Sequence, residues 1–144
     1  MSIVSTAKLV VPSRVRLADL VHAAAEQLAG IAGFGEEDAL NIGLAVREAA
    51  VNAIRHGNAE DPGTPLQVDF EILQTGFRVV VRDRGPGFDA DEGDDPTAPE
   101  NLLKTSGRGL LMMRAFMDGV LFRSEDTGGF AVTLFKRLQG DAGA

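Results

Sequence analysis

The sequence has no cysteine among its 144 residues and only two histidines, His22 and His56. The lack of cysteine excludes a disulfide scaffold, a thiol nucleophile and cysteine-ligated zinc or iron–sulfur sites. Two histidines are too few for a multi-histidine metal site. Cysteine-free composition suits a reducing compartment, so we expect a cytoplasmic protein. Tryptophan and tyrosine are also absent, which leaves eight phenylalanines as aromatic interface anchors.

Positive charge is scarce. The 14 lysines and arginines are outnumbered by 21 acidic residues, which gives a net charge of −7 and a pI of about 4.7. A phosphate backbone would be repelled, so we expect no direct binding of nucleic acid. No apolar run is long enough to span a bilayer, and the first residues lack a signal-peptide pattern, so we expect no membrane association. Length and composition fit one globular domain over residues 1–144.

Periodicity and turn signals predict five strands and three helices. The expected strands are residues 3–11, 66–73, 77–83, 120–124 and 130–137, and the expected helices are residues 13–29, 36–56 and 107–117. Ser13 is expected to cap the first helix and Gly30 to end it. Residues 84–106 show no clear period, and the tail 138–144 is expected to be flexible. The order β-α-α-β-β-loop-α-β-β indicates an α+β two-layer sandwich, with a mixed, mostly antiparallel sheet and helices on one face.

The second predicted helix carries a polar stripe. Glu48, Asn52 and His56 follow one another at four-residue spacing, and Asn41 and Ala45 fall on the same stripe. Most of the remaining circumference is apolar, so the helix is expected to be buried. A carboxylate and an amide on such a helix must face a partner or a cavity. The alternative, a stripe that faces solvent, stays open on spacing alone.

Two glycine-rich segments flank the long loop. Asp83 ends a strand and is followed by Gly85 and Gly87, which allow a ligand to approach the backbone closely. Residues 106–110, Ser-Gly-Arg-Gly-Leu, open a helix, where exposed amides and glycines suit a phosphate group. Neither is a P-loop or a Rossmann motif, and each alone is a common loop or helix cap. Together, in this order around one loop, they indicate a nucleotide site.

This combination resembles the histidine-kinase-like ATPase superfamily, also called the GHKL or Bergerat fold. Residues 48–58, Glu-Ala-Ala-Val-Asn-Ala-Ile-Arg-His-Gly-Asn, resemble its N box. Residues 83–87 resemble its first glycine box and residues 107–109 its second. The intervening residues, about 84–106, correspond to the ATP lid of that superfamily.

Within the superfamily, the sequence is most similar to stand-alone bacterial anti-sigma factors that are serine/threonine kinases. The short chain, the lack of a phosphotransfer histidine segment and residues 109–118, Gly-Leu-Leu-Met-Met-Arg-Ala-Phe-Met-Asp, carry this similarity. The resemblance covers roughly residues 10–137.

The resemblance implies a site for ATP or ADP with Mg²⁺. By matching position, Glu48 is the general base that takes a proton from the attacking hydroxyl. Asn52 would hold Mg²⁺ at the phosphates, and Asp83 would accept a hydrogen bond from the adenine amino group. The implied nucleotide-binding residues are Asn52, Asp83, Gly85, Gly87, Thr105, Ser106, Gly107, Arg108, Gly109 and Leu110.

The same resemblance implies a function and partners. It implies an anti-sigma factor that phosphorylates a serine or threonine of a STAS-type antagonist, sequesters a sigma factor and forms a homodimer. The alternative is a nucleotide-binding module that holds a partner without phosphoryl transfer. Glu48 favours the kinase, because Asn52 and the glycine boxes would suffice for binding alone. Thr105, where some relatives carry a basic residue, and the acidic run between 89 and 95 favour the module.

Overall fold

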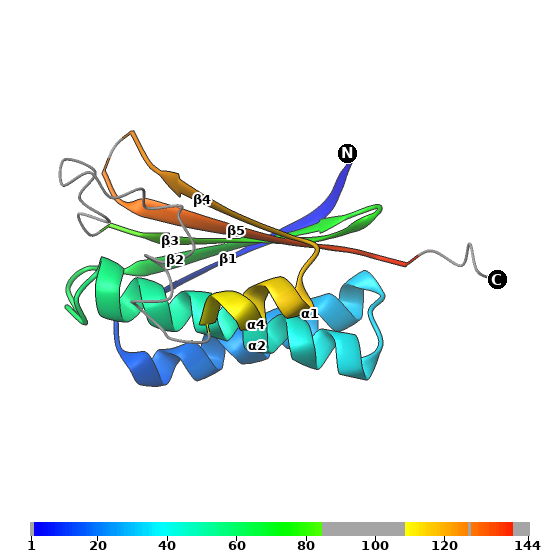
Figure 1. Cartoon of the computed structure of the whole chain (residues 1–144), viewed down its shortest axis with the longest axis horizontal. Helices are drawn as coiled ribbons and strands as arrows, with labels where there is room; N and C mark the ends of the chain where they lie inside the picture. Colours follow the sequence, from blue (N-terminus) through cyan, green and yellow to red (C-terminus); the bar gives the residue numbers. More distant parts are fainter. Residues whose placement is uncertain (1, 85–108, 127, 140–144) are drawn as a thin grey trace.

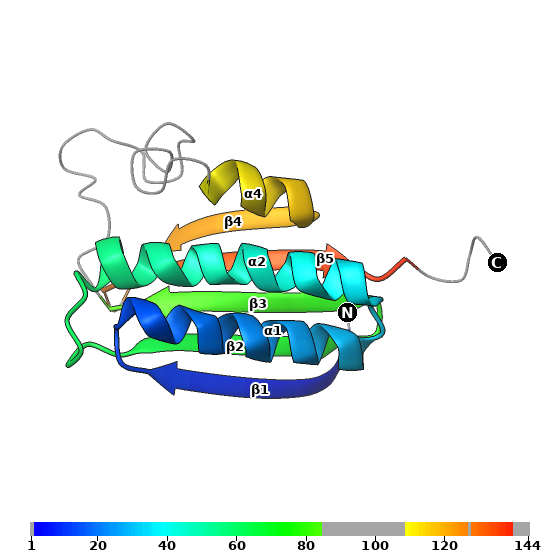
Figure 2. The same cartoon turned by 90° about the horizontal axis from the view of Figure 1, so that it is seen from below.

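The computed structural model describes residues 2–84, 109–126 and 128–139. Five strands form one sheet, with all helices on one of its faces (Figures 1 and 2). The strands are β1 (Ile3–Val11), β2 (Leu66–Leu73), β3 (Gly76–Asp83), β4 (Gly119–Ser124) and β5 (Phe130–Arg137), in the spatial order β1-β2-β3-β5-β4. The expected α+β two-layer sandwich is confirmed. All four pairings between these strands are antiparallel, so no described pair is parallel where a mixed sheet was expected.

The helical layer has α2 at its centre. A 3₁₀ turn (Val15–Leu17) precedes α1 (Ala18–Ala32), α2 (Glu36–Asn52) continues into a π-helical turn (Ala53–Gly57), and α4 (Gly109–Phe116) follows β3 in the chain. Helix α2 packs against α1 on one side and α4 on the other (Figure 2). Among the described residues, no helix is long and apolar enough to cross a membrane.

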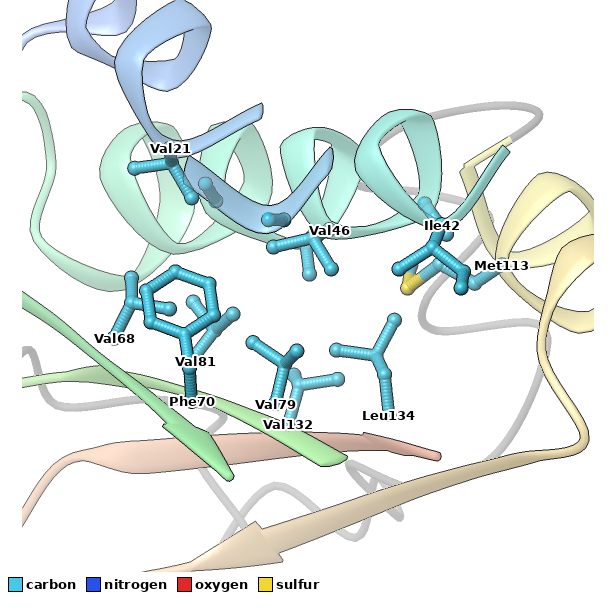
Figure 3. Packing of buried hydrophobic residues seen from close by; sticks show 14 of the residues in the cluster. Val21, Ile42, Val46, Val68, Phe70, Val79, Val81, Met113, Val132 and Leu134 are labelled. Carbon is cyan, nitrogen blue, oxygen red and sulfur yellow. The ribbon is translucent and has the colours of Figure 1, made fainter. Parts of the chain in front are cut away.

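The core lies between the helices and the sheet. Figure 3 shows Val46 of α2 pointing toward Val79 and Val132 of the sheet, with Met113 of α4 beside Ile42. The expected alternation of β2 is confirmed: Leu66, Val68, Phe70 and Ile72 are buried, and the intervening polar residues are half-buried. Those polar residues line the outer face of the sheet.

Cross-strand ion pairs connect that outer face. Arg78 of β3 pairs with Glu71 at 2.5 Å, and Arg82 pairs with Asp69 at 2.9 Å and with Glu125. Their partly exposed side chains add little net stability, because solvent screens such pairs. They do fix which side chains face outward, and they agree with the β2–β3 register.

The first helix begins and ends later than expected. Helix α1 passes through Gly30 and ends at Gly33, whose φ of 117° lies in the left-handed region. The Phe34 amide donates to the Ala29 carbonyl at 3.1 Å, which closes the last turn as a Schellman motif. Ser13 is not a helix cap, because its hydroxyl donates to the Thr64 carbonyl at 2.5 Å. A long-range hydrogen bond therefore takes Ser13 out of the cap role, whereas the local Schellman motif at Gly33 ends the helix.

Two further expectations concern the C-terminal third. The expected third helix, 107–117, is α4 over Gly109–Phe116, and residues 107 and 108 lie outside the described residues. Leu138 does not belong to a flexible tail, because its amide donates to the Thr75 carbonyl at 2.8 Å and its side chain packs on the core. Residues 140–144 lie outside the described residues.

The corrected end of α1 predicts opposite effects for two alanine substitutions. Gly33→Ala forces a side chain into a left-handed conformation and should lower the free energy of unfolding by about 1–2 kcal/mol. Gly30 is helical, and a Cβ built there meets nothing within 4 Å. Gly30→Ala should therefore raise the free energy of unfolding by about 0.5–1 kcal/mol. Urea denaturation of both variants checks this, and a destabilised Gly30→Ala would contradict the boundary.

Candidate functional site

The predicted site residues on the second helix and on β3 lie at one end of the molecule. The C-terminal end of α2, the end of β3 and the start of α1 meet there, at the left in Figure 2. Glu48 and Asn52 lie on the last turns of α2, one turn apart, and both are half-buried. Asp83 is the last residue of β3. The fold therefore brings Glu48, Asn52 and Asp83 to the same end of the helical layer.

Asn52 holds a buried oxygen with an unused lone pair. Its side-chain Oδ1 is inaccessible to solvent and has no hydrogen-bond partner among the residues that the structure describes. A buried amide oxygen without a donor is costly, so its presence points to a ligand. An amide oxygen is a ligand that Mg²⁺ accepts, and Mg²⁺ commonly uses one or two protein groups plus phosphates and water. The residue therefore fits the implied metal.

The described residues offer little else to hold a cation by themselves. Within residues 2–84, 109–126 and 128–139, no group of three or more histidine, aspartate or glutamate side chains could hold a metal ion. A cation bound by Asn52 would therefore complete its shell with phosphate and water oxygens. This donor set suits a metal that arrives with a nucleotide better than a permanently bound one.

Asp83 is packed against the π-helical turn. The Asp83 side chain belongs to a residue only 7% exposed. A Cβ on Gly57 would lie 2.1 Å from the Asp83 Oδ2 atom, so only glycine permits this approach. The π turn thereby sets the end of the helix directly against the carboxylate. Sequence reasoning gave Gly57 no such part, although the position follows His56 in the N-box pattern.

The π-helical turn ends the alignment of side chains in the predicted polar stripe. A π-helical turn holds more residues per turn than an α-helix, so four-residue spacing no longer keeps side chains aligned. His56 is exposed, as is Arg55, whereas Asn52 is half-buried. Ala45, expected to leave room for an approaching group, is fully buried. Only the part of the stripe from Glu48 to Asn52 therefore remains a candidate site.

A buried polar network joins the neighbouring segments. Asn58 is 4% exposed and Ser13 is fully buried. The Asn58 side-chain amide donates to Ser13 Oγ at 2.8 Å and to the carbonyls of Thr64 and Pro65 at 3.3 and 3.2 Å. Its Oδ1 accepts the backbone N–H of Arg84 at 2.8 Å. Sequence reasoning gave Asn58 no role and interpreted Ser13 as a cap; no local signal reports partners 26 to 51 residues away.

The remaining predicted residues divide into two groups. Gly109 and Leu110 begin α4, and both are buried where α4 packs beside α2. Six others lie outside the described residues: Gly85, Gly87, Thr105, Ser106, Gly107 and Arg108. The same holds for the expected ATP lid of residues 84–106, apart from Arg84. Their assignment to the site stays a prediction.

Comparison with known proteins gives a consistent picture. The family described as histidine kinase-like ATPase domain matches residues 11–136. The serine-protein kinase RsbW of Bacillus subtilis (strain 168) is 26% identical over 137 residues, covering 91% of this chain and 84% of that protein. The anti-sigma F factor of Geobacillus kaustophilus (strain HTA426) is 36% identical over 106 residues, covering 71% of each.

One solved structure shares the fold. The crystal structure of the RsbU and RsbW domains of Rv1364c from Mycobacterium tuberculosis aligns with a TM-score of 0.66 at 22% identity. The alignment covers 93% of this chain and 32% of that longer chain. The similarity extends the resemblance from motifs to the path of the backbone.

The orphaned oxygen predicts a stability gain on its removal. Asn52→Leu keeps the approximate shape and removes a buried acceptor without a donor, so it should raise the free energy of unfolding by about 1 kcal/mol. Asn41→Leu, on the same helix and also half-buried, is the control, with an expected change within about 0.5 kcal/mol. Chemical denaturation without added ligands measures both. A destabilised Asn52→Leu would show that the oxygen is satisfied in solution.

Proposed function

The chain belongs to the histidine kinase-like ATPase domain family, and we propose that it is an ATP-dependent serine/threonine kinase and anti-sigma factor. It phosphorylates a serine or threonine of an antagonist protein of the STAS type, and it sequesters a sigma factor. Relatives named serine-protein kinase RsbW and anti-sigma F factor support this activity. Because its partners control transcription inside the cell, its location is the cytoplasm.

The buried oxygen of Asn52, which has no hydrogen-bond partner among the described residues, carries the nucleotide-binding part of this proposal, and Glu48 lies one helical turn before it. A nucleotide-binding module without phosphoryl transfer would use this oxygen too, so Glu48 is the residue that favours the kinase. Asn52 Oδ1 would hold Mg²⁺, and the metal would supply charge neutralisation at the phosphates. Asp83, held against Gly57, accepts a hydrogen bond from the adenine amino group and so fixes the orientation of the nucleotide.

Glu48 supplies the proton acceptor for transfer. Residues one helical turn apart project in similar directions, so Glu48 and Asn52 address neighbouring atoms. The acceptor hydroxyl oxygen forms a bond to the γ-phosphorus as the bond to the β–γ bridging oxygen breaks. ADP leaves, and Glu48 takes the hydroxyl proton. Positioning and charge neutralisation do most of this work, as in other phosphoryl transfers.

Replacing Glu48 separates transfer from binding. Glu48→Gln keeps the shape of the side chain and removes the base, so phosphoryl transfer should fall roughly 10²–10⁴-fold while nucleotide affinity changes little. The measurement uses labelled ATP, Mg²⁺ and a cognate antagonist with a serine or threonine acceptor, alongside calorimetry for affinity. Asn52→Ala is the comparison, because loss of the metal ligand should weaken binding and transfer together.

Two outcomes would change the assignment. Transfer by Glu48→Gln at the wild-type rate would mean that another group is the base. Wild-type protein that binds a sigma factor and transfers no phosphate to any cognate antagonist would favour the binding module without catalysis.

The proposed function includes a homodimer built on β1 and α1. β1 is an edge strand, and Ile3, Val4 and Val10 on it are 50 to 60% exposed. Leu20 of α1 is 48% exposed. An apolar edge left open invites pairing with another chain. Light scattering at micromolar concentration should give about twice 15.2 kDa for the wild type. The double variant Val4→Lys, Val10→Lys should be monomeric, and a monomeric wild type would refute the dimer.

A further inference from the structure

Both ends of the Asn58 side-chain amide are hydrogen-bonded, and chemistry fixes which end faces which partner. The backbone N–H of Arg84 can only donate, so the amide oxygen of Asn58 faces it. The carbonyls of Thr64 and Pro65 can only accept, so the amide nitrogen faces them and Ser13. Aspartate in this place would lack both donors, and serine would be too short to reach both sides. The position therefore requires asparagine.

The hydrogen bond from the Arg84 N–H to Asn58 constrains the backbone of Asp83. The Arg84 nitrogen belongs to the peptide group that follows Asp83, and because a peptide group is planar, holding its N–H fixes the plane of the Asp83 carbonyl. On the other side, Gly129 lies so close that a Cβ there would be 2.3 Å from the Asp83 carbonyl oxygen. Gly57 bounds the carboxylate in the same way. Asp83 is thus confined at its side chain and on both sides of its carbonyl.

The other end of Asn58 is anchored in the body of the protein. Ser13 accepts from Asn58 and donates to the Thr64 carbonyl, so the three residues form a closed set of bonds. Directly after Asn58, Ala59 and Glu60 both have left-handed backbones, with φ of 52° and 56°. Such conformations persist in non-glycine residues only where surrounding contacts enforce them. The buried amide supplies that enforcement beside the site.

We propose that Asn58 is a positioning residue that holds Asp83 in place through the Arg84 peptide and thereby sets the preference of the site for adenine. The proposal rests on the proposed nucleotide-binding function. Asn58 itself touches no nucleotide. It connects the corner between β1 and α1, the segment at Thr64 and Pro65, and the end of β3.

The test compares two nucleotides that differ at the atom Asp83 is proposed to read. ADP carries an amino group at purine position 6, and inosine diphosphate carries an oxo group there. Calorimetry with Mg²⁺ should show that wild-type protein prefers ADP, and that Asn58→Ala lowers the ADP-to-inosine-diphosphate affinity ratio by about fivefold or more, the worth of one misplaced hydrogen bond. Asp83→Ala is the reference: it gives the ADP-to-inosine-diphosphate affinity ratio of a site that lacks the carboxylate acceptor.

Two variants separate positioning from stability. Ser13→Ala removes one anchor of Asn58 and leaves the Thr64 and Pro65 carbonyls, so the ratio should fall by a smaller factor. Phe77→Leu, in the core at the opposite end of β3 from Asp83, should lower the unfolding midpoint and leave the ratio unchanged. If Asn58→Ala does not fold, the ADP-to-inosine-diphosphate affinity ratio of Ser13→Ala tests the inference in its place.

The outcomes are distinguishable. Wild-type protein that binds neither nucleotide contradicts the proposed function. Wild-type protein that binds both equally contradicts the reading of adenine by Asp83 and with it this inference. An Asn58→Ala variant that weakens both nucleotides by the same factor, or keeps the wild-type ratio, shows that Asn58 only stabilises the fold and overturns the inference.

Discussion

Burial of α2 between α1, α4 and the sheet is the contact on which the site depends. The residues that α2 turns inward are mostly small: Ala39, Gly43, Ala45, Ala49 and Ala50 are buried, several of them fully. Small side chains let the helix lie close to its neighbours on three sides, and close packing leaves little freedom for the helix to shift. Glu48 and Asn52 are therefore carried on a rigid element, which is what a site that must align reacting atoms needs.

Residues at and just after the C-terminal end of α2 adopt locally unfavourable arrangements. The Asn52 side-chain oxygen has no partner among the described residues, the helix widens into a π turn, and Ala59 and Glu60 adopt left-handed backbones. Each feature opposes local preference, and such features gather at functional sites because surrounding structure can hold them there. Here the surrounding structure is the network of Asn58 and Ser13, which draws on three separate stretches of chain. Stability from the alanine-rich packing offsets strain at the helix end.

The two faces of the sheet carry different kinds of side chains. The inner face carries the core and ends in Asp83, so the same strand that packs Val79 and Val81 delivers the acceptor to the site. The outer face carries ion pairs between β2, β3 and the turn after β4. It contributes no side chain to the proposed nucleotide site. The outer-face ion pairs and the proposed nucleotide site therefore lie on opposite faces of the sheet.

The sequence by itself determined the element order, most element bounds, the layer architecture and the identity of Glu48, Asn52 and Asp83 as site candidates. These rest on local patterns: two-residue alternation in strands, helical spacing of apolar residues and glycines that follow a strand. Tertiary structure alone decided that Ser13 bonds across the chain rather than capping a helix and that Leu138 packs on the core. It also decided that Gly57 and Asn58 border Asp83. Local preference ranks several conformations within a short window, but partners far apart in sequence choose among them, and only the folded chain brings those partners into contact.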